Sequence, residues 1–174
     1  MTAPKILPDV EYLRECFRYE PKTGLVWWKT RPSKHFLSKR IWLGWNARLA
    51  ETQAFMTPNG DGYLYSRLDG VQMYAHRVIW KLVTGREPPN RIDHDDGKTN
   101  NNRWKNLRAA SHPQNIANRH SPVLAKSGVR GVHKARGKWI VQAGGRYVGS
   151  FEDLAEAVTA RTIAMKTRYG EFAP

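Results

Sequence analysis

Apolar side chains recur at helical spacing near the start of the chain. Residues 12–17 place them at i, i+1, i+4 and i+5, which predicts a short helix. Residues 20–24 (Glu-Pro-Lys-Thr-Gly) end it, and the Leu-Val-Trp-Trp run at 25–28 predicts a strand. Residues 29–55 are basic and irregular, and their pattern indicates no element. We therefore expect a small α/β region at the N-terminus.

An Asp-Gly pair between two strand-like runs predicts a β-hairpin. The runs are residues 63–68 and 71–75, and Asp69-Gly70 between them suits a tight hairpin turn. Residues 76–85 follow, with apolar side chains at helical spacing and Gly85 as the expected C-terminal stop. A hairpin and a helix are therefore expected in direct succession.

The next unit predicts a strand, a polar loop, a second strand and a helix. The strands are residues 91–94 and 107–109, and the loop is 98–105. Ser111 is the expected N-cap of the helix, with a proline in the first turn and Gln114 three residues after the cap.

Three strand-like runs and a helix fill the end of the chain. The runs are residues 131–134, 138–143 and 146–151, separated by glycines. We expect the final helix to start at Ser150, with Asp153 completing a capping-box-like pair. Its apolar face comprises Leu154, Ala157, Val158, Ala164 and Met165.

The excess of basic over acidic residues indicates a negatively charged partner. The chain has 29 Lys and Arg against 15 Asp and Glu, a net charge of +14. Nucleic acid is the usual partner of such a protein, although charge does not separate DNA from RNA. No apolar run is long enough to span a membrane, and the N-terminus lacks the apolar run of a signal peptide. Cys16 is the single cysteine, so the sequence predicts no disulfide, no cysteine-pair zinc site and a reducing intracellular compartment.

Asp93 and His94 bring a carboxylate and an imidazole together at the end of a predicted strand. Hydrolysis of a phosphodiester needs a base for the attacking water, and histidine suits that role. It also needs a hard cation, for which oxygen ligands are suitable. Because adjacent strand residues point to opposite faces, a break in the strand is needed to aim both groups at one phosphate.

The surrounding residues resemble the HNH nuclease motif of phage and intron-encoded homing endonucleases. Each piece alone is ordinary turn chemistry, so the ordered set carries the resemblance. It spans about residues 73–119 and consists of Ala75-His76-Arg77-Val78-Ile79, Asp93-His94-Asp95-Asp96-Gly97, Lys98-Thr99-Asn100-Asn101-Asn102, Asn106-Leu107-Arg108 and Asn115. The resemblance implies a ββα-metal (His-Me finger) nuclease core and hydrolysis of phosphodiester bonds in duplex DNA.

The resemblance also implies roles for single residues. Asp93 and Asn115 would hold one Mg²⁺ or Mn²⁺, an oxygen-ligand pair that favours these ions over zinc. His94 would be the general base, and Asn106 would hold the loop and orient the His94 ring through its backbone. Contacts to DNA are expected from His76, Arg108 and Arg119. For His76, a structural hydrogen-bonding role is the alternative.

The C-terminal residues resemble the ethylene-response-factor (APETALA-type) DNA-binding domain. The motifs are Gly128-Val129-Arg130-Gly131-Val132-His133, Gly137-Lys138-Trp139, Tyr147-Val148-Gly149-Ser150-Phe151 and Ala155-Glu156-Ala157. The resemblance implies a three-stranded sheet, backed by one helix, that lies in the major groove. Strand alternation turns Val141 and Val148 toward the helix. The candidate DNA contacts are Arg130, His133, Arg136, Lys138, Gln142 and Tyr147. A small module for protein contact is the alternative.

These patterns together predict an α+β chain in four parts. They are a basic and aromatic N-terminal region at 1–60, an HNH nuclease domain at 61–120, a linker at 121–127 and a DNA-binding domain at 128–174. The tryptophans of the first part lie among basic residues, which suits DNA contact and core packing equally.

The expected protein is a free-standing, monomeric endonuclease of phage type that binds double-stranded DNA in the host cytoplasm and has no membrane association. One alternative is a non-catalytic DNA-binding regulator that uses the C-terminal module alone. Another is a protein that binds or cuts RNA.

Overall fold

The computed structural model describes residues 6–118 and 126–173. It divides after Ala109 into two compact units, residues 1–109 and 110–174. Helices and short sheets alternate along the chain, as expected for the α+β class. No helix of the described residues is long and apolar enough to cross a membrane. The finer division into four parts stays a prediction.

The described residues of the first unit form three small antiparallel sheets and three α-helices. In chain order the elements are α1 (Val10–Cys16), β1 (Phe17–Glu20), β2 (Leu25–Trp28), η1 (Ser33–His35), α2 (Lys39–Leu49), β3 (Gln53–Ala54), β4 (Thr57–Pro58), β5 (Leu64–Leu68), β6 (Val71–Tyr74), α3 (Ala75–Thr84), β7 (Ile92–His94), η2 (Trp104–Asn106) and β8 (Leu107–Ala109). The sheets have the orders β1-β2-β3, β4-β5-β6 and β7-β8.

The core of the first unit lies where α1, β2 and α3 meet. Leu13 and Cys16 of α1 and Val78 and Ile79 of α3 have no exposed surface. The helical stripe expected at residues 12–17 is therefore the buried face of α1, except that Phe17 already begins β1. Burial of these side chains from both helices supplies much of the driving force for folding this unit.

The expectation of no regular element at residues 29–55 is wrong, because this stretch contains the eleven-residue helix α2. Ser38 caps it by accepting a hydrogen bond from the backbone N–H of Ile41. No residue of α2 is fully buried, and only Trp45 and Leu49 pack against the core. A helix with so narrow an apolar face has little periodic signal in its sequence.

The hairpin of β5 and β6 is confirmed, with Leu68 paired to Val71. Asp69 and Gly70 both have positive φ, 50° and 78°, as a turn between right-twisted strands requires. The chain enters α3 directly after β6, and α3 ends as expected at Gly85, which is left-handed with φ 71°.

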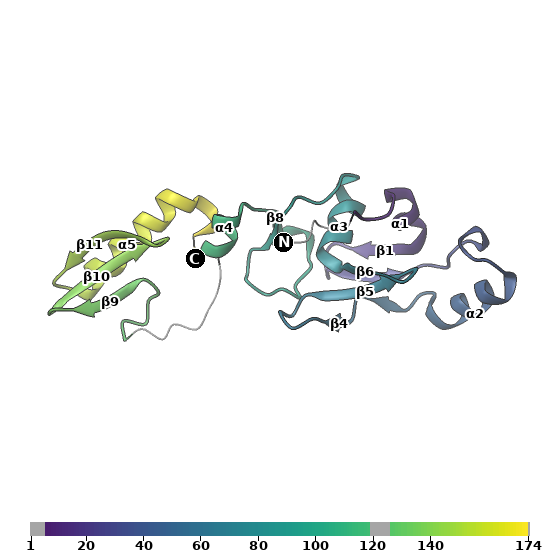
Figure 1. Cartoon of the computed structure of the whole chain (residues 1–174), viewed down its shortest axis with the longest axis horizontal. Helices are drawn as coiled ribbons and strands as arrows, with labels where there is room; N and C mark the ends of the chain where they lie inside the picture. The colour runs from purple at the N-terminus through teal and green to yellow at the C-terminus, as the bar shows by residue number, and fades with distance from the viewer. Residues whose placement is uncertain (1–5, 119–125, 174) are drawn as a thin grey trace. The chain divides into compact units, whose positions relative to one another are not determined.

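The second unit is a three-stranded antiparallel sheet with one long helix (Figure 1). Its elements are α4 (His112–Ala117), β9 (Val132–Ala135), β10 (Lys138–Ala143), β11 (Arg146–Phe151), α5 (Leu154–Tyr169) and η3 (Gly170–Phe172). Strand β10 lies between the other two, and α5 packs on β10 and β11. Val132, Val141 and Ala157 form the fully buried centre of this packing.

Two expectations about β11 and α5 are wrong. The final helix begins at Leu154 rather than at Ser150, which remains in β11. Asp153 alone caps it, accepting hydrogen bonds from the backbone of Ala155 and Glu156. Val148 does not turn inward, because a β-bulge opposite Val141 and Gln142 leaves it unpaired and 38% exposed. The bulge adds one residue to β11 and so reverses the alternation that the sequence suggests.

The strands expected around the polar loop are confirmed as the antiparallel pair β7 and β8. The helix expected after them is α4, with the predicted capping box between Ser111 and Gln114. Because α4 belongs to the second unit, the packing of a ββα core stays a prediction.

Candidate active site

The candidate site is built on β7 and on the loop that joins it to β8. Asp93 pairs with Arg108 and His94 with Leu107 across the two strands. All three residues of β7 are buried, so the Asp93 and His94 side chains are both held inside the first unit. The 3₁₀ turn η2 leads the loop back into β8.

Asn106 closes this loop with its side chain. Its amide nitrogen donates to the Asp96 carboxylate at 2.9 Å and to the backbone oxygen of Asn101 at 2.8 Å. Its amide oxygen accepts from the backbone N–H of Asp96 at 3.0 Å. Asn106 is itself buried, so these bonds fix the loop firmly beside His94.

His94 is buried in a largely aromatic environment. His94 is only 3% exposed, and its Nε2 lies 3.4 Å from the amide oxygen of Asn102. The rings of Tyr63 and His76 lie 5.8 and 5.5 Å from the His94 ring, centroid to centroid. Burial lowers the pKa of His94, and Asn102 and Asp93 offset this only in part. At neutral pH the imidazole is therefore uncharged and able to accept a proton.

His76, at the start of α3, stands against the same ring. It contacts the rings of Tyr63 and Tyr74 as well as His94. Burial, with smaller contributions from His94 and Arg77, lowers the pKa of His76 to about 3. Among the described residues, its buried Nδ1 has no hydrogen-bond partner. Ring packing rather than hydrogen bonding thus holds this residue in place.

Asp93 is held by Arg108, the residue opposite it in the sheet. The guanidinium Nε donates to Asp93 Oδ2 at 2.9 Å, and Nη1 lies 2.5 Å from Asp95 Oδ1. The Arg108 side chain is only 17% exposed. Arg108 was expected to contact DNA, and the structure places it between two carboxylates of this site.

The sequence predicts a hard divalent ion at this site. The described residues contain no group of three or more His, Cys, Asp and Glu that could hold a metal. Of the two ligands expected from the sequence, Asp93 lies on β7 in the first unit and Asn115 on α4 in the second, so this pair stays a prediction. Carboxylate and amide oxygens are ligands that Mg²⁺ accepts, and few protein ligands leave room for water and phosphate oxygens on such an ion.

The candidate DNA contacts of the second unit lie at its surface. His133 pairs with Ile140, and Gln142 with Tyr147, so these residues follow the sheet face opposite the buried Val141. Lys138 forms an exposed ion pair with Glu152 at 2.8 Å. The exposed residues of the set are Arg130, His133, Arg136, Lys138, Gln142 and Tyr147. Arg119, the remaining candidate, lies outside the described residues.

Comparison with known proteins identifies the segment that carries this site. Residues 73–117 match a family model described as HNH endonuclease. The matched segment runs from β6 to α4 and includes His76, Asp93, His94, Asn106 and Asn115. No curated protein and no solved structure matches the chain. The match supports the expectation of an HNH nuclease that acts on DNA.

The sequence did not single out the neighbours that surround His94. Tyr63 precedes β5, about thirty residues before His94, and no periodicity links the two. Asn102 belongs to a run of three asparagines that is common in turns. Its position as the third member of that run gave no sign that it faces the imidazole.

Proposed function

We propose that this protein is a metal-dependent HNH endonuclease of the homing type that hydrolyses phosphodiester bonds in duplex DNA. The observation that carries the proposal is the buried imidazole of His94, beside the Asp93 carboxylate and inside the matched residues 73–117. An uncharged imidazole next to a carboxylate is the pair of groups that activation of water at a phosphate requires.

In the proposed reaction, His94 takes a proton from the water that attacks phosphorus. Burial keeps the imidazole uncharged before this step, and Asn102 favours the protonated ring after it. The rings of Tyr63 and His76 restrict the plane of the imidazole. The residues around His94 therefore both orient the base and support the charge that it acquires.

Asp93 and Asn115 are the proposed ligands of the divalent ion, Mg²⁺ or Mn²⁺. When bound, such an ion supplies positive charge for the departing 3′ oxygen. Arg108 keeps the Asp93 carboxylate in one orientation through the 2.9 Å hydrogen bond from its Nε. Asn106 keeps the following loop closed, so that Asp93 and His94 are presented from a rigid segment.

The rest of the chain is proposed to bind the DNA. A net charge of +14 favours association with a polyanion. The exposed sheet face of the second unit, which carries His133, Lys138 and Tyr147, is the proposed ethylene-response-factor-like surface. One nuclease site cuts one strand, so we expect a phage-type monomer in the host cytoplasm to nick its target.

Conversion of supercoiled plasmid to nicked circle tests this function. We expect cleavage with Mg²⁺ or Mn²⁺ and none with EDTA. Asn115→Ala should raise the Mg²⁺ concentration needed for half-maximal cleavage, because one oxygen ligand is lost. The control is His112→Ala, at an exposed position of the same helix outside its capping box.

Two outcomes would contradict the proposal. DNA binding without cleavage under every metal condition would indicate a non-catalytic regulator. Preferential cleavage of RNA over duplex DNA at the same salt concentration would indicate a ribonuclease.

A further inference from the structure

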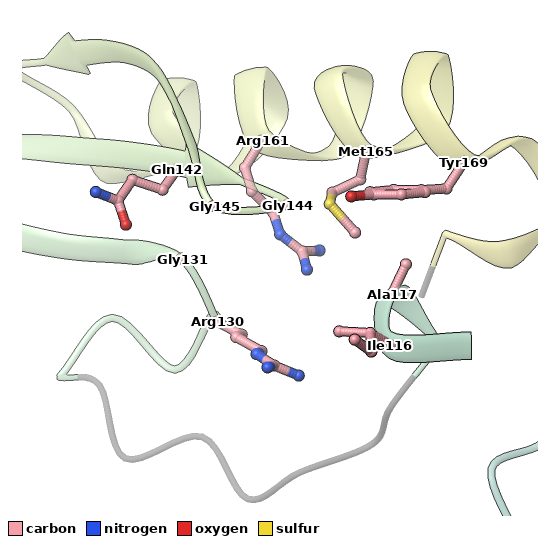
Figure 2. Close-up of a pocket in the computed structure, with 10 residues that line it drawn as sticks. All are labelled: Ile116, Ala117, Arg130, Gly131, Gln142, Gly144, Gly145, Arg161, Met165 and Tyr169. Carbon is pink, nitrogen blue, oxygen red and sulfur yellow. The ribbon is translucent and has the colours of Figure 1, made fainter. Parts of the chain in front are cut away.

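A cavity of about 330 Å³ lies inside the second unit, between α5, the sheet and α4. Figure 2 shows that the guanidinium groups of Arg130 and Arg161 both extend into it, from the segment before β9 and from α5. Ile116 and Ala117 of α4 form another wall. Since a water molecule occupies about 30 Å³, the cavity has room for a phosphate group with its attached sugar.

Arg161 occupies a position where an apolar side chain is expected. It lies one turn after Ala157 and one turn before Met165, both buried on the sheet-facing side of α5. Arg161 is itself only 9% exposed. Its buried Nε has no hydrogen-bond partner within the residues that the structure describes. A buried guanidinium donor left without an acceptor is costly, which points to an acceptor that comes from a ligand.

The charge of Arg130 adds to the energetic cost of burying Arg161. Burial lowers the pKa of Arg161, and the charge of Arg130 lowers it further. Two cations that face one cavity repel each other, and an anion between them would convert that repulsion into attraction. Guanidinium groups also match the planar oxygen pairs of phosphate better than any other side chain.

Another wall of the cavity carries a hydroxyl group that can donate a hydrogen bond to phosphate. Tyr169 lines the cavity next to the turn at Gly144, where an added Cβ would lie 2.1 Å from the Tyr169 hydroxyl. Glycine is therefore required for this phenol to reach its position. Gln142 and Arg130, which both line the cavity, are exposed, so a ligand can enter from solvent.

We infer that this cavity binds a phosphate group, held between Arg130 and Arg161. The phosphate of a DNA strand is the source that the net charge of +14 favours, and a free phosphate or nucleotide is the other source of the same chemistry. The site is separate from the residues around His94. It does not depend on cleavage, so its test uses binding alone.

The test measures the affinity of Arg161→Met for a fluorescent DNA duplex, in EDTA and over a series of salt concentrations. We expect about tenfold weaker binding and a salt slope shallower by about one unit, because one phosphate contact is lost. Lys166→Met is the matched control, since it removes one exposed positive charge from the same helix without lining the cavity. Its affinity should change less than threefold.

A double substitution tests whether the two arginines share one ligand. Arg130→Met and Arg161→Met combined should weaken binding by much less than the product of the single effects, since either change alone empties the same site. If the loss of affinity in the double variant equals the product of the two single losses, the inference that both arginines bind one phosphate is overturned. Circular dichroism of each variant confirms that the fold is retained, and Arg161→Lys, which keeps the charge, should lose less affinity than Arg161→Met.

Free phosphate distinguishes the two sources. If millimolar phosphate or deoxynucleotide raises the unfolding temperature of the wild type and not of Arg161→Met, while DNA affinity is unchanged, the site takes a free ligand. If only DNA binding responds to Arg161→Met, the site takes a backbone phosphate. Wild-type DNA affinity in Arg161→Met, together with no stabilisation by phosphate or nucleotide, would overturn the inference.

Discussion

Each unit of this protein buries an arginine, and the two arginines differ in how many hydrogen-bond partners the protein gives them. Arg31 in the first unit is 2% exposed and is surrounded by partners. It donates to Asp69 at 3.1 Å and to His35 Nδ1 at 3.3 Å, and its guanidinium lies 4.7 Å from the Phe36 ring centroid. Arg161 in the second unit is nearly as buried, yet its Nε has no acceptor among the described residues.

Two histidines of the first unit show the same contrast. His35 uses both ring nitrogens, Nε2 toward Glu15 at 2.6 Å and Nδ1 toward Arg31. His76 is buried with no hydrogen-bond partner at Nδ1 in the part of the chain that the structure describes. Buried polar groups with protein partners stabilise a fold, whereas His76 and Arg161, each with one unpartnered nitrogen among the described residues, lie at the two candidate sites. We interpret this difference as a sign that His76 and Arg161 serve a site and not the fold alone.

The largest expected effect on stability is at Arg31. Arg31→Met should lower the free energy of unfolding by about 3 kcal/mol, because it removes an ion pair, several hydrogen bonds and close aromatic contacts at once. Urea unfolding followed by tryptophan fluorescence measures the change. Arg40→Met, at an exposed position of α2, is the control and should change stability by less than about 0.5 kcal/mol. Equal changes in the free energy of unfolding for the two substitutions would contradict the structural role assigned to Arg31.

An intermediate effect is expected from the titration of His76. Its pKa of about 3 in the folded protein lies below the usual value, so the unfolded chain binds the extra proton as the pH falls. Stability is therefore retained above about pH 6.5 and lost as the pH falls toward the folded-state pKa.

His76→Phe isolates this contribution. Between pH 7 and pH 5 the free energy of unfolding should fall by about 2 kcal/mol more in the wild type than in the variant. Urea unfolding at each pH measures it. Parallel pH dependence in the two proteins would show that His76 does not titrate in this way.

The smallest effect, with the opposite sign to that of Arg31, is expected at Arg161. Replacing a buried, incompletely bonded cation by an apolar side chain of similar length is often neutral or stabilising. Arg161→Met should therefore leave the free energy of unfolding unchanged or raise it by about 1 kcal/mol. A loss comparable to that of Arg31→Met would mean that the second unit already satisfies Arg161 without a ligand.

Local signals determined how much of this fold was predictable. The Asp69-Gly70 hairpin, the Gly85 helix end and the Ser111 capping box depend on neighbours in sequence, and the structure has all three. Helix α2 was not predicted because a few tertiary contacts, not a buried stripe, hold it in place: Trp45 and Leu49 pack on the core, and Trp42 and Asn46 hydrogen-bond to the backbone of Arg31. The orientation of Val148 was wrong because a bulge has no simple sequence signature.

The same distinction applies to the candidate sites. Asp93 and His94 are adjacent in sequence and could be found as a motif. Tyr63 and Asn102, which surround the imidazole, come from separate loops and only the fold brings them together. Arg161 gave no signal, because a single arginine in a helix more often indicates a solvated face than a cavity.

The most direct test of the account is the rate of DNA cleavage by His94→Ala under single-turnover conditions with saturating Mg²⁺. Loss of the general base predicts a rate lower by about 10²–10⁴-fold, with an affinity for the same duplex in EDTA within threefold of the wild type. Cleavage by His94→Ala at the wild-type rate would contradict the assignment of the buried imidazole as the base.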